Sequence, residues 1–391
     1  MAVTSRRTEP QTWTNMKQMI HSHGRGSRSA ACSVLLLLLL SACANKQGDS
    51  LQTAAMIDPV GVASGPMSYD VRLRDNPEAE EMTLIMGPAH VPVSGSGHAH
   101  GGDHQGVLPE PRTIRIPKDI TITGIRYEVV DGDGSELPRG ILHHMNVIDP
   151  DRRELFLPIS HRMLAVGKET GAQSLPEWLI GYPIKRGTEP VITVMLHNPT
   201  HSDLQGVYVL LTLEYEDALE WTPVFGAYPF QVDVSFPAGD KQFDLPPGRS
   251  IFSWDGSPAM EGRILALGSH LHDHAEKIRL EDLTAGEVIW EGYPVVDDEG
   301  AIRGVTTGKL YWKGGKKLFP DHTYRATVVY NNPTSDTLRG GGMGVVAGLF
   351  RPAQAATWPV ADRSDHLYRL DRQHYLREVS GPYEEIAEHH H

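Results

Sequence analysis

The sequence predicts an all-β protein built from two β-sandwich domains in tandem. From residue 108 onward, short runs alternate apolar and polar side chains, as half-buried strands do. The alternation changes phase between Ile122 and Ile125, which predicts a β-bulge at Gly124. Helical periodicity is scarce before about 364, where Ser364 is expected to cap a short helix that ends near Gly381.

An internal repeat supports two domains of related layout. Residues 194–200 read Val-Met-Leu-His-Asn-Pro-Thr, and residues 328–334 read Val-Val-Tyr-Asn-Asn-Pro-Thr. The 391 residues of the chain are enough for two ordinary domains or for one large β domain, and the repeat favours two. We therefore predict an N-terminal metal-binding sandwich over 108–217, a C-terminal one over 218–362, and a helical tail over 363–391.

The N-terminus carries the pattern of an export signal. Arg25 and Arg28 precede the apolar run 34–40, which is too short to span a bilayer, and small residues follow it. Leu40-Ser41-Ala42-Cys43 has the form of a bacterial lipoprotein cleavage box, so residues 1–42 are predicted to be a signal peptide and Cys43 the acylated residue. A plain signal peptide is the alternative. Asn45 favours the outer membrane of the cell envelope.

Residues 43–107 are expected to form a tether, with strands near 68–74 and 82–86. The Gly/His tract with His98, His100 and His104 fits either loose metal capture or a solvated loop. His389–His391 receive no role.

Composition narrows the function. The whole chain has 36 Lys/Arg and 49 Asp/Glu residues. Residues 1–42 contain five Lys/Arg and one Asp/Glu, so the mature chain would have 31 basic and 48 acidic residues and a net charge of −17. Such a surface as a whole repels nucleic acid and anionic lipid, so no nucleic-acid partner is expected. Removal of the signal peptide would also remove Cys32 and leave only the acylated Cys43. Any metal site must then use His, Met or carboxylate ligands.

Histidines gather in three places. His270 and His272 lie two apart in a strand-like run, so both side chains point to one side. His143 and His144 are adjacent, and a bulge is needed for both to reach one ion. His197 is a third imidazole in another apolar run. Three imidazoles suit copper, zinc, iron and nickel alike.

Met343 makes copper the favoured metal. It lies in a Gly-rich run, and a thioether is a soft ligand that stabilises Cu(I). Taken alone, Met343 would more often be core packing. His274 shares the strand parity of His270 and His272, so a site of three histidines for zinc or copper is a further reading.

The set and order of these residues resemble the copper type II, ascorbate-dependent monooxygenases. This family includes peptidylglycine α-hydroxylating monooxygenase and dopamine β-monooxygenase, and the resemblance covers roughly residues 108–352. It implies two jelly-roll-type β-sandwiches that face each other across a solvent cleft and bind two copper ions per chain. The residues implied for the electron-transfer copper are His143, His144 and His197. Those implied for the catalytic, oxygen-activating copper are His270, His272 and Met343.

The implied activity is hydroxylation of an organic substrate with O2 and an external electron donor such as ascorbate. Two positions depart from the peptide-amidating members: Gly268 replaces an arginine and Ala347 a tyrosine, both of which help to hold a peptide carboxylate. The alternatives are a copper-binding or copper-handling lipoprotein without catalysis and, more weakly, a carbohydrate- or partner-binding β-sandwich.

The lipoprotein signal gives a first testable prediction. Cys43→Ala should abolish acylation and signal cleavage, because the lipid is attached through this sulfur, and the protein should no longer partition with membranes as a processed species. Cell fractionation and the mass of the mature N-terminus measure both. Cys32→Ala, which alters the other cysteine of the chain, is the matched control and should behave as wild type. A Cys43→Ala protein that is still cleaved and membrane-bound contradicts the prediction.

Overall fold

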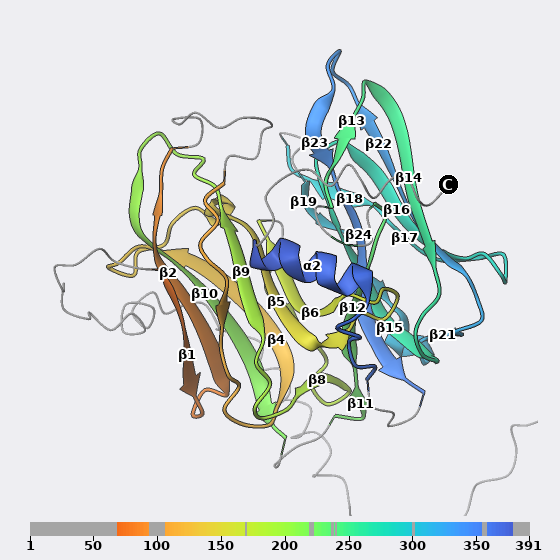
Figure 1. Ribbon diagram of the computed structural model, residues 1–391, viewed down its shortest axis with the longest axis horizontal. Helices are drawn as coiled ribbons and strands as arrows, with labels where there is room; N and C mark the ends of the chain where they lie inside the picture. Colours follow the sequence, from red (N-terminus) through yellow and green to blue (C-terminus); the bar gives the residue numbers. More distant parts are fainter. Residues whose placement is uncertain are drawn as a thin grey trace, which may run out of the picture. The chain divides into compact units, whose positions relative to one another are not determined.

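The computed structural model describes residues 69–93, 106–168, 170–218, 223–235, 238, 241–298, 302–353 and 358–377, and within them the chain is mostly β, with several sheets (Figure 1). The lipoprotein signal with Cys43, the tract of His98, His100 and His104, and His389–His391 lie outside these ranges. None of the helices in the described ranges is long and apolar enough to cross a membrane.

The N-terminal half forms two sheets, here called the N-terminal sheet pair. The larger sheet has the order β1 (Asp70–Asn76), β2 (Glu81–Val91), β10 (Leu204–Asp217), β4 (Ile120–Val130), β8 (Ile180–Ile184) and β11 (Phe225–Gly226), with β7 (Gln173–Ser174) paired to β4. The smaller sheet has the order β3 (Arg112–Thr113), β9 (Val191–Leu196), β5 (Leu142–Arg153) and β6 (Ser160–Gly167). The 3-10 helix η1 (Arg139–Ile141) leads into β5.

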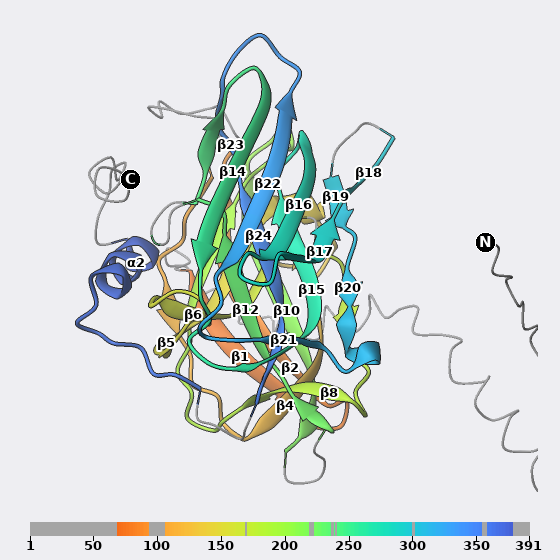
Figure 2. The same ribbon diagram turned by 90° about the vertical axis from the view of Figure 1, so that its right-hand side faces the viewer.

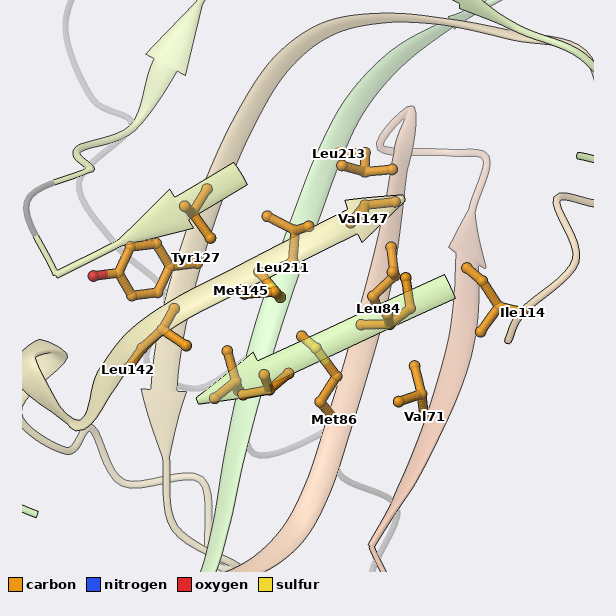
Figure 3. Close-up of a cluster of buried hydrophobic side chains, with 14 of the residues drawn as sticks. Val71, Leu84, Met86, Ile114, Tyr127, Leu142, Met145, Val147, Leu211 and Leu213 are labelled. Carbon is orange, nitrogen blue, oxygen red and sulfur yellow. The ribbon is translucent and has the colours of Figure 1, made fainter. Parts of the chain in front are cut away.

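Buried side chains from both of these sheets meet in one core (Figure 3). Leu84 and Leu211 come from the larger sheet, and Met145 and Val147 from β5 of the smaller one. Alternation along each strand explains the arrangement, because every second residue faces the opposite sheet.

The C-terminal half forms a second arrangement of the same kind, the C-terminal sheet pair. One sheet has the order β12 (Tyr228–Asp233), β24 (Gly344–Pro352), β15 (Gly262–Leu271) and β20 (Gly308–Lys309), with β21 (Lys316–Leu318) paired to β15. The other has the order β14 (Gly248–Gly256), β22 (Tyr324–Asn332), β16 (Ala275–Asp282) and β17 (Glu287–Gly292). Their shared core is separate from the N-terminal core and includes Phe230, Leu267, Tyr330 and Phe350.

Shorter elements complete the C-terminal half. These are the pair β13 (Phe243–Leu245) with β23 (Leu338–Gly342), the pair β18 (Pro294–Val296) with β19 (Ile302–Val305), the 3-10 helix η2 (Leu310–Lys313) and the helix α2 (His366–Leu376).

The N-terminal sheets begin earlier than the predicted boundary at residue 108. β1 and β2 belong to the larger sheet, and β2 alone contributes Met82, Leu84 and Met86 to the buried residues. The expected tether therefore contains two strands of the sheet, close to the ranges predicted for them. The bulge predicted at Gly124 is confirmed, since the register between β4 and β10 shifts next to this residue.

The internal repeat has the same hydrogen bonds in both halves. The amide nitrogen of Asn198 donates to the carbonyls of Val91 and Ser202, each at 2.9 Å, and the amide oxygen accepts from Thr200. Asn332 repeats this pattern with Leu245 at 2.9 Å, Asp336 at 2.8 Å and Thr334. Both side chains are buried, and each makes the same hydrogen bonds to its own turn. The two halves therefore share the same local structure at this point.

Buried polar contacts join the two sheet pairs and α2. His161 on β6 bonds through Nε2 to the Pro229 carbonyl of β12, at 2.9 Å. Glu154, also fully buried, accepts the backbone N–H groups of Arg162 and Gln231. The Arg162 guanidinium donates two hydrogen bonds of 2.5–2.6 Å to Asp371 of α2.

The tail helix differs from its prediction at both ends. Its N-cap is Asp365, whose carboxylate accepts the Leu367 N–H at 2.8 Å, and not Ser364. The helix ends at Leu376, because Arg377 adopts the left-handed conformation, well before Gly381. Asp365 is the N-cap because it directly precedes the helix, one residue nearer than Ser364, so its carboxylate reaches the first free N–H groups.

The repeated asparagine gives a second prediction. Asn332→Ala removes four hydrogen bonds and leaves buried polar groups unsatisfied, so it should lower the free energy of unfolding by about 2–4 kcal/mol. Its neighbour Asn331 has an exposed side chain, and Asn331→Ala is the matched control, with an expected change within about 0.5 kcal/mol. Urea denaturation of both variants measures the difference. Equal destabilisation would show that the asparagine contacts contribute nothing.

Candidate metal centre

His143 and His144 reach the same side of β5 because the strand is irregular at this point. Leu142 pairs with Leu196, and His144 pairs with Met195, so His143 is the extra residue of a bulge. The two imidazole rings lie 4.0 Å apart between centroids. The bulge that the adjacent histidines required is therefore confirmed.

The histidines of the C-terminal half lie where the chain passes from one sheet to the other. β15 ends at Leu271 in one sheet, and β16 begins at Ala275 in the facing sheet. The strand-like run of His270 and His272 therefore ends in a turn, and a second strand follows it. His274 has a φ of 72°, so it does not continue the parity of His270 and His272.

Imidazoles from the two sheet pairs meet in one cluster. The centroid of the His144 ring lies 5.1 Å from that of His270 and 6.2 Å from that of His272. His143 lies 6.3 Å from His272, and His270 lies 5.2 Å from His272. At the histidines the two sheet pairs are in contact and are not separated by the solvent cleft that the resemblance implies.

Three of these side chains form a group that can hold a metal ion. Within the described ranges, one ligand atom each of His144, His270 and His272 lies within 4.8 Å of the others. Nitrogens about 2.0–2.1 Å from a tetrahedral ion would stand roughly 3.4 Å apart, so a small closure of the rings completes the geometry. The Nε2 atoms of all three, and that of His143, are shielded from solvent. A set of imidazole ligands suits a transition metal.

Tyr330 joins the backbone of His272 to that of Met343. Its hydroxyl accepts the N–H of His272 at 3.0 Å and that of Met343 at 3.2 Å, and it donates to the Met343 carbonyl. Burial raises the pKa of Tyr330 to about 12, so the hydroxyl keeps its proton. Met343 also precedes Gly344, which pairs with Leu271, so its backbone lies beside the end of β15.

The observed grouping cuts across the predicted one. His144 was assigned with His143 and His197, yet its ring lies against His270. The backbone N–H of His197 bonds to the Ile141 carbonyl, which brings the residue to the start of β5. His197 and His274 are outside the three-histidine group.

A buried ion pair lies in line with His270. Asp233, Val345 and His270 are paired across β12, β24 and β15. Lys241 Nζ is 3.4 Å from the Asp233 carboxylate, and both side chains are almost fully buried. Burial raises the pKa of Asp233, while Lys241 and His270 act in the opposite direction.

The two departures from the peptide-amidating members are direct partners in the sheet. Gly268 pairs with Ala347, although the residues are far apart in sequence, and Gly268 shares the face of His270. A Cβ added to Gly268 would meet no heavy atom within 4 Å. The face beside His270 therefore has small residues and open space.

Sequence reasoning missed Tyr330 and Asp233. The signal for Tyr330 was present, since the internal repeat has Leu196 at the corresponding position. A polar group that replaces an apolar one inside a buried strand needs a partner, and here the partner is the site backbone. Asp233 had no comparable signal, because it acts across two strands.

Comparisons with known proteins add little. No family model matches the sequence, and no curated protein is similar to it. Among solved structures, the chain is similar to PNGF-II, at 8% identity and a TM-score of 0.34, over 72% of this chain and 65% of that chain. It is also similar to the Sputnik virophage, at 10% identity and a TM-score of 0.23 over 82% and 92% of the two chains. It is similar as well to the mavirus major capsid protein, at 9% identity and a TM-score of 0.21, over 73% of this chain and 86% of that chain. With such low TM-scores, no property of these proteins is transferred.

The Tyr330 hydroxyl, which bonds to the backbone of both His272 and Met343 and is here called the clamp, gives a third prediction. Tyr330→Phe removes the group that fixes the backbone of His272 and Met343, so affinity for a metal ion held by the histidines should fall about 10- to 100-fold. Tyr324→Phe is the matched control: it lies on the same strand and its buried hydroxyl accepts the Phe319 N–H, away from the histidines. Both variants should lose stability, but only Tyr330→Phe should lose affinity. Chelator competition measures it, and equal affinities would exclude the clamp.

Proposed function

We propose that the protein is a copper-dependent monooxygenase that hydroxylates an organic substrate outside the cytoplasm. The observation that carries the proposal is the meeting of His144 with His270 and His272, which come from different halves of the chain. The three residues lie on strands far apart in sequence, and their ligand atoms lie within 4.8 Å of one another, close enough to share one ion after a small adjustment. Every histidine predicted as a ligand, except His197, lies in the ring cluster.

In this proposal two copper ions occupy adjoining ligand sets. His143, His144 and His197 hold the electron-transfer ion, and His270, His272 and Met343 hold the ion that meets oxygen. The sheet pairs correspond to the two jelly-roll-type sandwiches of the resembling family. The repeated asparagine turns support two related domains. The donor set of imidazoles and a thioether fits copper better than zinc, which seldom takes methionine.

The residues of the chain have separate tasks in the reaction. Bound copper supplies one-electron redox chemistry and an open position for O2. The bulge at His143 turns two adjacent imidazoles to one side. Tyr330 keeps His272 and Met343 in register. The surrounding side chains shield the Nε2 atoms from water, and the exclusion of water from the ligands suppresses side reactions.

The open face at Gly268 and Ala347 indicates the kind of substrate. No arginine or tyrosine stands there to bind a carboxylate, and the added space beside His270 admits a larger group. We therefore expect a substrate without a terminal carboxylate near the reacting carbon. An external one-electron donor such as ascorbate is needed to recharge the copper.

A copper-handling lipoprotein without catalysis is the second candidate. The contact between the sheet pairs favours it, because closely packed imidazoles hold an ion without leaving room around it. Reductant-dependent O2 consumption by the copper-loaded protein separates the two functions. The enzyme should consume O2 faster than free copper when substrate is added, and the handling protein should consume none.

Met343 gives the fourth prediction. Met343→Ala should weaken Cu(I) binding at one site of two, and O2 consumption should fall far more than copper content, because the lost thioether stabilises the reduced ion. Met343→His should restore binding but not turnover. Met260→Ala is the control, since Met260 packs against the C-terminal core. If all variants hold two Cu(I) with the affinity of wild type, the thioether is not a ligand. A wild-type stoichiometry of one would show instead that the histidines form one shared site.

A further inference from the structure

We propose that Trp178 and Trp312 form a docking surface for an anionic phospholipid membrane. The two indoles are 59% and 62% exposed, although large aromatic side chains are usually buried. They come from different halves of the chain, and their ring centroids lie 6.5 Å apart. Two exposed tryptophans in contact indicate a binding surface more than chance exposure does.

The surface rests on a rigid base. Leu179 and Tyr311, which adjoin the two tryptophans in sequence, pack in one cluster with the buried Leu265 of β15. Val224, 63% exposed, extends the apolar surface, because the next residue pairs with β8 immediately after Leu179. Trp178 lies in the turn before β8 and Trp312 in η2, and each adjoins a residue of this packed cluster.

The segment around Trp312 is locally basic, although the chain as a whole is acidic. Residues 309–317 read Lys-Leu-Tyr-Trp-Lys-Gly-Gly-Lys-Lys, so four lysines lie in nine residues of a chain whose net charge is −13. Lys316 and Lys317 pair with Glu287 and Glu261. Lys309 and Lys313 flank Trp312 on the exposed surface. Arg263 adds a further cation, since its guanidinium donates to the Gly314 and Gly315 carbonyls.

Tryptophan beside lysine fits the interface of a bilayer. Indole rings prefer the headgroup level, where the ring is apolar and the N–H is hydrated, and lysines are attracted to anionic headgroups. A sugar would stack on one flat ring face, but these rings are tilted by 44° to each other, and the exposed Lys309 and Lys313 lie close to Trp312 in the sequence. The chemistry therefore favours lipid over a glycan.

The length of chain before the described part allows this docking. Twenty-five residues, 44–68, separate Cys43 from Tyr69. Fully extended, they reach at most about 90 Å, so a lipid on Cys43 would let any face meet the bilayer. Tethering also raises the effective concentration of the surface at the membrane into the millimolar range, so weak contacts suffice. Since β20 pairs with β15 at Ala266 and Leu267, docking would hold the strand of His270 toward the lipid.

Quenching of tryptophan emission by brominated lipid tests the proposal. The full chain is reconstituted in phosphatidylethanolamine and phosphatidylglycerol vesicles, with and without brominated acyl chains. Wild type should be quenched, and Trp178→Ala/Trp312→Ala should lose the quenching. Both side chains are exposed, so the thermal unfolding midpoint should stay unchanged. Lys309→Glu/Lys313→Glu should be quenched less than wild type in these vesicles and equally in neutral phosphatidylcholine.

A transplanted tryptophan provides the matched control. Gln373 is exposed on α2, which lies on the opposite side of the ribbon from β20 (Figure 2). Gln373→Trp, added to the double alanine variant, should not be quenched if the protein docks through the proposed surface. Three results overturn the proposal: no quenching of wild type, which leaves the surface to a protein or glycan partner; quenching that persists in the double variant; or equal quenching of the transplanted tryptophan, which shows contact without orientation.

Discussion

The metal centre depends on the buried polar contact between the two sheet pairs, because neither pair supplies all of its imidazoles. Burial lowers the pKa of His161 to about 4, so this ring stays neutral and bonds to the Pro229 carbonyl. Burial also raises the pKa of Glu154 to about 7, and its carboxylate accepts backbone N–H groups from both sides of the contact. Polar groups that are desolvated in this way are satisfied in only one docking geometry, so they fix the position of His144 relative to His270.

The sequence was most informative where local chemistry determines the backbone. Two adjacent histidines that serve one ion require a bulge, and a phase change at a glycine indicates another; both are observed. It was least informative where the chain changes sheets. The run around His272 keeps strand alternation through a turn, because the turn is made by His274 at positive φ and not by glycine or proline.

The histidines of the cluster could be predicted as candidate ligands, but their grouping could not. Spacing shows which side chains share a strand face, and it carries no information on how closely the two sheet pairs approach. That approach places His144 against His270 and merges two predicted sites into one cluster. Tyr330 and Asp233 escaped prediction for a related reason, since each acts on the site through tertiary contacts.

The two halves share a scaffold but not a site. Asn198 and Asn332 make the same hydrogen bonds at the same turn, so this feature serves the fold in both. The residues just before them differ: Leu196 and His197 in one half correspond to Tyr330 and Asn331 in the other. One half thus carries an imidazole at this edge, and the other carries a hydroxyl that fixes the strand end with His272 and Met343. Because the backbone frame is common, these substitutions are what distinguish the two turns chemically.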